Sequence, residues 1–466
     1  MIDFETLYSW VRDLPIIDWH NHLDMRALAE DRPLGSLYEV WVKSDPYKHR
    51  AMRICGEPER VITGDAPEAD KWAAWTRTLP KLVGNPLFAW AKMEMDWLGL
   101  FNAEPQSSRE GTWIRGLKNV SLADWTPSKM LKRFGVEYLS PCVGAGELAG
   151  LKTSDLGLSR LPGKSPAPSE VRSPKSSFRI VPSLRMNAGD EISAETLEKF
   201  DAAGCRVVDV SVDDVSRLTT NDYSLATVAA YAAAHGWTML LHLGALRETS
   251  TRLRVAAGPV GGFAGMRAPV DPAAVAEFLN MLETGDFSHK DHSGNVKLCN
   301  CGNMETTINQ CGIGSTPAMD NSAIPQSHNS TIPQFHNNFL PRTILMSLNP
   351  EAHAQLAVLA GSFVEAGVPG KVQLGPAWWW CDHEEGIRDV LEKNAAYGVL
   401  STFVGMTTDS RSLLSFVRHD YFRRILCKWV AEKVASCAFP DDESLLRPML
   451  ENICYKNAHD MVFSWR

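Results

Sequence analysis

The sequence predicts an α/β protein built as a (β/α)8 TIM-type barrel, with a mostly helical insertion between the first two strands. Short apolar runs recur along the 466 residues, and amphipathic stretches such as AHAQLAVLAGSFVEAG follow most of them. This alternation is typical of parallel β/α units. Eight runs can be distinguished, and eight parallel strands close a β/α barrel.

The eight predicted strands begin with LPIIDWH and end with LSTFVGMTTD. Each run is short and apolar, as expected for strands that are buried on both faces of a parallel sheet. In chain order the predicted strands cover residues 14–20, 135–143, 178–185, 205–212, 238–247, 342–350, 371–379 and 400–409.

The chain is long enough for one large domain with insertions. Residues 1–23 are expected to hold an N-terminal segment and the first strand, and residues 135–466 the remainder of the barrel. The Trp-rich residues 24–134 form the predicted helical insertion. Because this insertion follows the C-terminal end of a strand, where barrel enzymes place active-site covers, we expect it to cover the site.

A second interruption, at about 286–338, is a low-complexity loop. It is rich in Asn, Ser, Thr and Gly and repeats IPQSHN as IPQFHN. This composition predicts a disordered surface loop. Its spacing matches no standard zinc module, although it contains five potential ligands: His289, His292, Cys299, Cys301 and Cys311.

Charge and composition restrict the partners. The formal net charge is −8, from 47 basic and 55 acidic residues, which argues against a nucleic-acid partner and leaves a small molecule as the expected one. The start MIDFETLYSW lacks the pattern of a secretory signal, and no apolar run is long enough for a membrane helix. The ten cysteines show no disulfide framework, so a cytoplasmic protein with reduced thiols is expected.

The stretch LPIIDWHNHLD places Asp18, His20 and His22 at the end of the first strand. Alternate residues share one face of a strand, so both imidazoles point the same way, with Asp18 on that face beneath them. We expect all three side chains to belong to a metal-proximal active site. Asp409 follows the last strand, which closes beside the first, and could complete a His-His-Asp metal site or act as a base. Arg411 lies two residues further on. The alternatives are a polar strand end and a surface ion pair.

Basic and aromatic residues follow other predicted strands. Arg185 ends the third strand, and His242 and Arg247 lie at the end of the fifth. Arginines at strand ends can clamp a carboxylate with two parallel hydrogen bonds, although fold-stabilising salt bridges are the alternative. Three adjacent tryptophans at 378–380 cannot all be core residues, because neighbours face opposite sides, so at least one is expected to line the pocket.

Several segments of the chain together resemble a known family. The H-x-H after the first strand, the Asp after the last strand and the barrel resemble the amidohydrolase superfamily. Within it the chain is similar to the uronate isomerase (glucuronate isomerase) family. The segments that carry the resemblance are LPIIDWHNHL, SDPYKHRAMR, VITGDA, NPLFAW, LHLGALRETSTR, RTILMSLNP, PAWWW, FVGMTTDSRSLLSFVRHDYFRRILC and ENICYKNAH.

The resemblance implies interconversion of D-glucuronate with D-fructuronate, and of D-galacturonate with D-tagaturonate, through an enediol. A proton must leave C2 and return to C1, and the family pattern assigns this transfer to Asp409. It also implies that His20, His22 and Asp409 hold a divalent metal ion, most simply zinc. His20 and the hydroxyl of Tyr47 would stabilise the charge on the enediol.

The same resemblance implies how the sugar acid is held. Arg185 and Arg411 would bind its C6 carboxylate, and His242, Trp379 and Arg247 would shape the rest of the pocket. A large enzyme of this kind is expected to be a homo-oligomer.

Three departures from the family pattern indicate a divergent member. Pro46 stands where a pocket histidine is expected, and LSPCVGAGE replaces a Thr-Asp-Asp-Pro pattern at the end of the second strand. The fourth strand ends in Asp209-Val210 in place of Asp-His. These positions lie where substrate contacts are made, so a different sugar acid is a credible substrate.

Two other functions fit part of the pattern. A metal-dependent hydrolase or decarboxylase would use the same site with a metal-bound hydroxide, but the sequence offers no obvious lysine or extra histidine pair for a binuclear centre. A non-catalytic sugar-acid binding protein would not require a base, and the presence of His20, His22 and Asp409 together argues against it.

Overall fold

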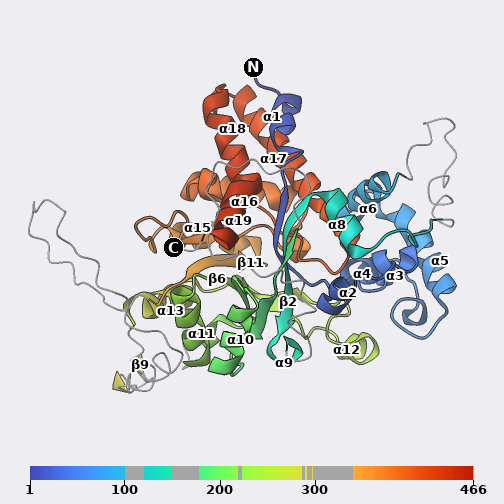
Figure 1. The fold of residues 1–466 in the computed structure, drawn as a ribbon, viewed down its shortest axis with the longest axis horizontal. Helices are drawn as coiled ribbons and strands as arrows, with labels where there is room; N and C mark the ends of the chain where they lie inside the picture. Colours follow the sequence, from blue (N-terminus) through green and yellow to red (C-terminus); the bar gives the residue numbers. More distant parts are fainter. Residues whose placement is uncertain are drawn as a thin grey trace, which may run out of the picture.

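A curled, mostly parallel sheet forms the centre of the molecule in the computed structural model (Figure 1). The structure describes residues 1–99, 120–148, 178–218, 223–285, 289–290, 296–297 and 339–464. The strand order is β1-β2-β4-β5-β6-β11-β12, with β3 paired to β2, and all these pairs are parallel. The strands are β1 (Ile16–Asn21), β2 (Val136–Gly144), β3 (Arg179–Ile180), β4 (Ser183–Asn187), β5 (Val207–Val212), β6 (Thr238–Leu243), β11 (Arg342–Ser347) and β12 (Val372–Leu374).

Seven of the eight predicted strands coincide with strands of this sheet, but the prediction of a strand over 400–409 is wrong. Residues Leu400–Thr402 form a 3-10 helix, and 403–410 run alongside β1 without strand geometry. Two backbone bonds still join this segment to β1, from His22 N to Ser410 O (2.8 Å) and from Asp409 N to His20 O (3.1 Å). Gly405 and Asp409 have φ of +74° and +47°, values outside the β region, which explains the absence of a strand.

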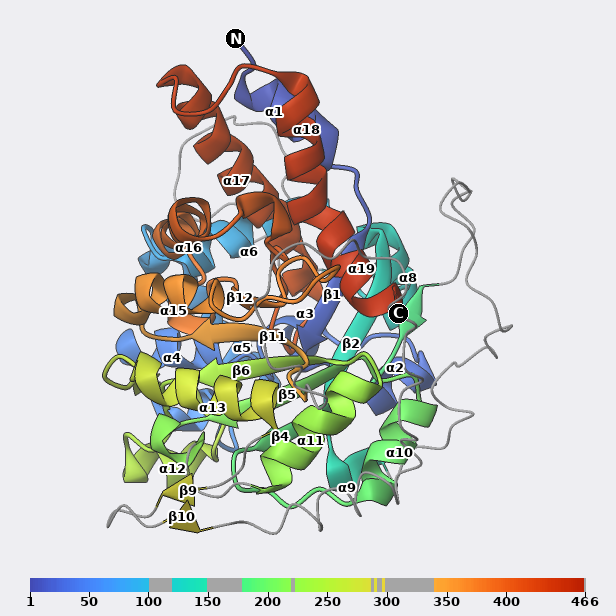
Figure 2. The same cartoon turned by 90° about the vertical axis from the view of Figure 1, so that its left-hand side faces the viewer.

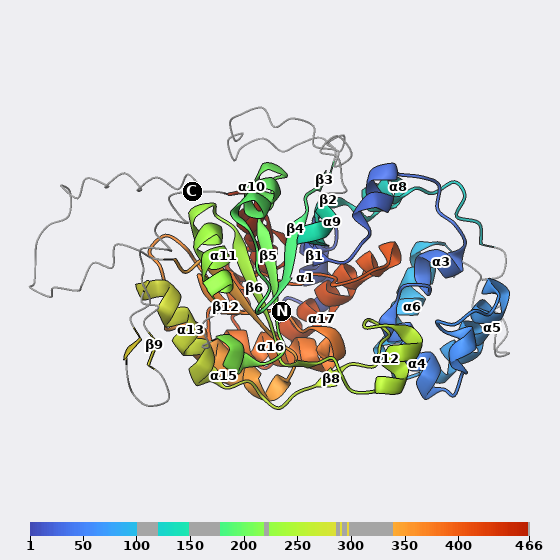
Figure 3. The ribbon, with the colours of Figure 1, turned by 90° about the horizontal axis from the view of Figure 1, so that it is seen from below.

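Helices cover the outer face of the curled sheet, as Figures 2 and 3 show. The chain termini contribute a group of helices at one end of the molecule. The covering helices are α9 (Ala145–Leu148), α10 (Ala194–Ala202), α11 (Tyr223–Ala234), α13 (Pro272–Thr284), α15 (His353–Ala360) and α16 (Glu384–Tyr397), and the terminal group is α1 (Phe4–Val11), α17 (Val417–Ala435), α18 (Glu443–Glu451) and α19 (Asn457–Phe463).

Both faces of the sheet are buried, as the apolar runs predict. In β5, Val208 and Val210 belong to the core that the sheet forms with the outer helices. Val207 lies on the inner face and packs in a second cluster with Leu240 and Ile344. Alternation along each strand therefore fills the inside of the curl with apolar side chains, and polar side chains reach the inner face nearer the strand ends.

The described residues between β1 and β2 form a separate helical group, drawn in blue and teal on the right of Figure 1. It has its own apolar core, which includes Trp41, Trp75 and Met52. The loop after β6, with the short pair β7 (Ala245–Leu246) and β8 (Gly265–Met266) and helix α12 (Thr251–Ala257), meets this group. The group contains α2 (Met25–Glu30), α3 (Leu37–Trp41), α4 (Pro46–Ile54), α5 (Glu68–Thr78), α6 (Pro86–Trp97) and α8 (Pro127–Phe134).

Pro46 has a clear local role at the start of α4. Asp45 is the N-cap and accepts hydrogen bonds from Tyr47 N and Lys48 N, and Pro46 occupies the first turn. This position suits proline, since its missing N–H would have no partner there. The loop after β6 presses on this turn: a Cβ on Gly262 would lie 2.1 Å from Pro46 O. Only glycine permits so close an approach.

The segment at about 286–338 lies almost entirely outside the described residues. Within it the structure describes only the strand pair β9 (His289–Lys290) and β10 (Val296–Lys297). The expectations for this segment therefore stay predictions. Across the described ranges, no helix is long and apolar enough to cross a membrane.

Asp18 joins β1 to the segment before Asp409. Its Oδ1 accepts hydrogen bonds from Thr407 Oγ1 (2.9 Å) and Thr408 N (2.7 Å), and its Oδ2 accepts one from Thr408 Oγ1 (2.8 Å). Asn21 Nδ2 and His419 Nε2 also contact the carboxylate, at 3.1 and 3.2 Å. Asp18 is fully buried and does not line the candidate site. The expectation that it shares the metal-proximal site is thus wrong, because its oxygens are already used in the fold.

Replacing Asp18 by Asn is expected to lower the free energy of unfolding by about 2–4 kcal/mol, because an amide nitrogen would face buried donors. Urea denaturation measures the change. Asp13→Asn is the matched control, since Asp13 is largely exposed beside Arg12, and should change little. A loss under about 1 kcal/mol in Asp18→Asn would show that this network does not hold the two segments together.

Candidate active site

A cavity of about 690 Å³ lies at the C-terminal ends of the strands, between the sheet and the helical group that follows β1. The nine residues to which the family resemblance gives a role in catalysis, substrate binding or metal binding all line it. The structure thus brings together side chains from across the chain: His20, His22, Tyr47, Arg185, His242, Arg247, Trp379, Asp409 and Arg411.

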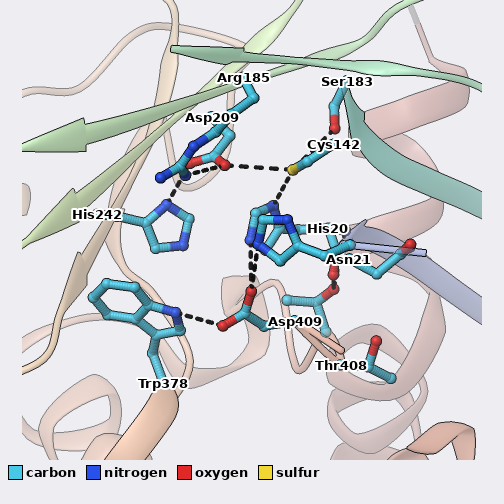
Figure 4. A network of polar contacts seen from close by, with 12 residues as sticks. His20, Asn21, Cys142, Ser183, Arg185, Asp209, His242, Trp378, Thr408 and Asp409 are labelled. Atoms are coloured by element: carbon cyan, nitrogen blue, oxygen red, sulfur yellow. Dashed lines mark hydrogen bonds and ion pairs between the residues drawn. The ribbon is translucent and has the colours of Figure 1, made fainter. Parts of the chain in front are cut away.

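Two imidazoles converge on one carboxylate in this cavity. His20 Nε2 and His22 Nε2 each lie 3.1 Å from the same oxygen, Oδ1 of Asp409. The histidines come from the end of β1, and the backbone bonds between β1 and residues 409–410 bring Asp409 beside them. Figure 4 shows the carboxylate of Asp409 below the imidazole of His20.

Asp409 is held ionised and in one orientation. Burial would raise the pKa of its carboxyl group, but the hydrogen bonds from His20 and His22 outweigh burial and keep that pKa well below the ordinary value. Its other oxygen, Oδ2, accepts a 2.7 Å hydrogen bond from Trp378 Nε1. The left-handed backbone of Asp409 is costly for a residue with a Cβ, so the surrounding bonds must fix it.

The two imidazoles and the carboxylate fit a divalent cation. Tetrahedral zinc with bonds of about 2.0–2.1 Å separates its ligand atoms by about 3.3 Å, close to both 3.1 Å contacts. Burial lowers the pKa of His22 to about 4, so this ring is neutral at pH 7 and has a lone pair for a metal. Burial alone would lower the pKa of His20, but Cys142 and Asp209 raise it well above the ordinary value. Positive charge is therefore favoured at His20.

A second set of potential ligands overlaps the first. Ligand atoms of His20, His22, Cys142 and Asp209 all lie within 4.8 Å of one another. Asp209, however, already binds the Arg185 guanidinium and accepts a 2.7 Å hydrogen bond from His242 Nδ1. Because these donors neutralise Asp209, it is less suited to a metal than Asp409.

Cys142, Asp209 and Trp378 contribute to the site. The sequence had given no role to Cys142 or Asp209, and it named Trp378 only as one of three tryptophans of which at least one should line the pocket. Strand register positions Cys142 and Asp209: Cys142 pairs with Ser183, and Arg185 pairs with Asp209. Burial opposes ionisation of Asp209, but Arg185 and His242 hold the pKa of the carboxyl well below its usual range. Cys142 and Asp209 both lie in strand-end segments that depart from the family pattern. That departure was the only sign in the sequence that these two residues belong to the site.

Four arginines line the cavity: Arg26, Arg185, Arg247 and Arg411. They differ in how their guanidinium groups are already paired. Arg185 is paired with Asp209, and Arg247 donates from Nε to Asp213 (3.0 Å) and from Nη2 to Ser211 Oγ (2.5 Å). Within the described part of the chain, no acidic side chain forms an ion pair with Arg411. Arg26 also has no acidic partner among the described residues, but it is exposed, whereas Arg411 is partly buried and lies two residues from Asp409. Arg411 is therefore the cavity cation best placed to accept a carboxylate beside Asp409.

Three buried polar atoms of the cavity residues have no hydrogen-bond partner among the described residues. They are the hydroxyl of Tyr47, Nε2 of His242 and Nε1 of Trp380. Burial lowers the pKa of His242, so this ring is neutral and its unpartnered Nε2 can accept a hydrogen bond. Buried polar atoms are rarely left unpaired, which indicates that a bound molecule satisfies them.

Aromatic rings form one wall of the cavity. All three tryptophans at 378–380 line it, and Trp379 lies under the guanidinium of Arg247, 5.1 Å from the ring centroid. The ring of Tyr47 packs edge-on against Trp380, with centroids 5.4 Å apart. The prediction that at least one tryptophan lines the pocket is confirmed.

Comparison with known proteins places the chain in a family. A family model described as glucuronate isomerase matches residues 3–143 and 302–462. The uronate isomerase of Bacillus licheniformis is 28% identical, over 97% of this chain and 93% of the relative. That of Halalkalibacterium halodurans is also 28% identical, over 98% and 95%. These matches favour an isomerase over the hydrolase, decarboxylase and binding-protein alternatives.

Solved structures agree on the fold. The uronate isomerase of Thermotoga maritima has a TM-score of 0.73 at 21% identity, covering 99% of this chain and 97% of that one. The glucuronate isomerase of Caulobacter crescentus has a TM-score of 0.68 at 17% identity, covering 98% and 93%. Since the family model matches well over half of the chain, the chain belongs to the glucuronate isomerase family.

Proposed function

We propose that this site interconverts D-glucuronate with D-fructuronate, and D-galacturonate with D-tagaturonate, by proton transfer through an enediol. The observation that carries the proposal is a set of unsatisfied groups around one ionised carboxylate. The Tyr47 hydroxyl, Nε2 of His242 and the Arg411 guanidinium line the same cavity as Asp409. A hydroxyl-rich molecule with one carboxylate provides a partner for each.

Asp409 is the base that takes the proton from C2 and returns it to C1. Among the described carboxylates that line the cavity, Asp24 and Glu147 are exposed and Asp45 is paired with Lys48. Asp409 is buried and has no Lys or Arg partner there. A carboxylate of such low pKa is a weak base, so the reaction depends on strong stabilisation of the enediolate.

The groups around the two imidazoles stabilise the negative charge on O1 and O2 of the enediolate. His20, His22 and Asp409 would hold a divalent metal ion, for which zinc is our choice because it accepts both imidazole and carboxylate ligands. When bound, such an ion supplies Lewis-acid stabilisation of the enediolate oxygens. The Tyr47 hydroxyl donates a hydrogen bond to the same oxygens, and burial keeps its pKa raised so that it retains its proton.

The C6 carboxylate of the sugar acid binds to Arg411. Arg185 serves a different purpose from the one the family pattern implies, since its guanidinium is occupied by Asp209. Arg247, fixed by Asp213 and stacked on Trp379, forms the positive and aromatic side of the pocket. His242 accepts a hydrogen bond from a sugar hydroxyl through Nε2.

The proposal also covers the architecture around the site. The curled sheet closes as a (β/α)8 barrel, with 403–410 in the place of the eighth strand, and its backbone bonds to β1 support this closure. Residues 24–134 act as the cover, residues 1–23 and 135–466 form the barrel, and the cover excludes water from the enediol. We place the enzyme in the cytoplasm as a homo-oligomer that acts on a small sugar acid and binds neither nucleic acid nor membrane, in keeping with its net charge of −8.

Asp409→Asn is expected to lower kcat about 10²- to 10⁴-fold, since an amide cannot accept the proton. NMR of D-glucuronate or D-galacturonate in D2O with the zinc-loaded protein measures ketose formation and deuterium exchange together. Asp441→Asn, at a surface ion pair with the N-terminus, is the control and should behave as wild type. Neither ketose nor exchange with folded, zinc-loaded wild type would contradict the proposed function.

Arg411→Met is expected to raise KM about 10- to 100-fold, because a charge-assisted hydrogen bond contributes about 1.5–3 kcal/mol. Steady-state kinetics on the hexuronate measure this effect, with Arg447→Met as a surface control. An unchanged KM in Arg411→Met beside a large increase in Arg247→Met would show that the carboxylate binds at Arg247.

A further inference from the structure

Cys142 lies between a carboxylate and a histidine of the site. Its Sγ is 3.2 Å from Nδ1 of His20 and donates a 3.3 Å hydrogen bond to Oδ2 of Asp209. The side chain comes from β2 and lines the cavity. Figure 4 shows the continuous path from Asp209 through the sulfur to His20.

The positions of the hydrogens along this path follow from the donors around Asp209. Arg185 and His242 both donate to this carboxylate, which is fully buried and can only accept when ionised. The thiol hydrogen therefore points to Asp209. A sulfur lone pair then faces His20, so Nδ1 of His20 must carry a hydrogen.

Asp209 also binds His242, and here the contact is direct, with no thiol between the two side chains. Nδ1 of His242 donates a 2.7 Å hydrogen bond to Oδ1 of Asp209, so the lone pair of the neutral ring is on Nε2. That Nε2 is buried and has no partner among the residues that the structure describes. The rings of His242 and His20 lie side by side, with centroids 4.8 Å apart.

We propose that Asp209 is a positioning residue that fixes the tautomer and orientation of two histidines, His242 directly and His20 through the Cys142 thiol. Both rings then carry hydrogen on Nδ1 and turn Nε2 to the cavity, where Nε2 of His20 meets Asp409 and Nε2 of His242 has no partner among the described residues. The inference rests on the proposed function, because Nε2 of His20 is the proposed metal ligand and Nε2 of His242 the proposed substrate acceptor. Cys142 itself is not a metal ligand, since it faces Nδ1, the other side of the His20 ring from Asp409.

Arg185 completes this arrangement. Its guanidinium holds Asp209 ionised and keeps its second oxygen turned toward Cys142. Partners of this kind, which contact a metal ligand but not the metal, change metal affinity about 10- to 100-fold when they are removed. The effect on metal binding can be measured without turnover, so a substrate other than a hexuronate would leave the test valid.

The test compares zinc dissociation constants, by chelator competition, for wild type, Cys142→Ala, Cys142→Ser and Cys437→Ser. Cys142→Ala is expected to weaken zinc binding about 10- to 100-fold. Cys142→Ser should restore most of the affinity, because a hydroxyl can accept from Nδ1 and donate to Asp209. Cys437 is exposed and outside the site, so Cys437→Ser should match wild type. Equal affinity in Cys142→Ala and wild type would overturn the proposal.

Two spectroscopic measurements separate positioning from direct ligation. Wild type loaded with cobalt should show no thiolate-to-cobalt charge-transfer band; a band that disappears in Cys142→Ser would make Cys142 a ligand and overturn the proposal. In metal-free Asp209→Asn, ¹⁵N NMR should show His242 as a mixture of tautomers, where wild type has hydrogen on Nδ1. An unchanged His242 tautomer would also contradict it. Isomerase activity, measured separately, reports on the proposed function alone.

Discussion

The site depends on the buried carboxylate of Asp18, which ties β1 to the segment that carries Asp409. Thr407 and Thr408 donate three hydrogen bonds to it. These bonds hold a stretch of chain with positive φ at Gly405 and Asp409, where a regular strand cannot form. Together with the backbone bonds between β1 and residues 409–410, this buried carboxylate fixes the histidines relative to Asp409 without itself entering the cavity.

Two further carboxylates, those of Asp409 and Asp209, orient the histidines inside the site. Asp409 contacts Nε2 of both His20 and His22. Asp209 accepts a hydrogen bond from Nδ1 of His242 and one from the Cys142 thiol, which in turn contacts Nδ1 of His20. His20 is thereby contacted at both ring nitrogens, and His242 is held at Nδ1 with Nε2 turned to the cavity. Such double support is what preorganises a metal or substrate site, because the rings lose no further freedom on binding.

Much of this arrangement could be predicted from the sequence. Apolar runs located seven strands, and strand alternation put His20 and His22 on one face. The cavity contains all nine residues to which the family resemblance gave a role. The roles were harder to assign: Arg185 was expected to bind substrate, but the register of β4 and β5 sets it against Asp209. Register and side-chain pairing depend on the assembled sheet, and no local pattern encodes them.

The errors have the same physical origin. The last predicted strand fails because positive φ at Asp409 cannot be read from a β-rich composition. Asp18 was expected in the site because it alternates with His20, but its oxygens are satisfied by threonines almost four hundred residues away, as the separation of 390 positions to Thr408 indicates. Cys142 could not be recognised from the sequence for the same reason, since its role comes only from its contacts with His20 and Asp209 in the folded chain.

The measurement that tests the account most directly is the anomalous difference map of a zinc-loaded crystal at the zinc absorption edge. We predict one peak about 2.0–2.2 Å from His20 Nε2, His22 Nε2 and an oxygen of Asp409. A peak bound by Cys142 and Asp209, or no peak in this cavity, would contradict the assignment of Asp409 and the histidines as the cation site on which the proposed isomerisation depends.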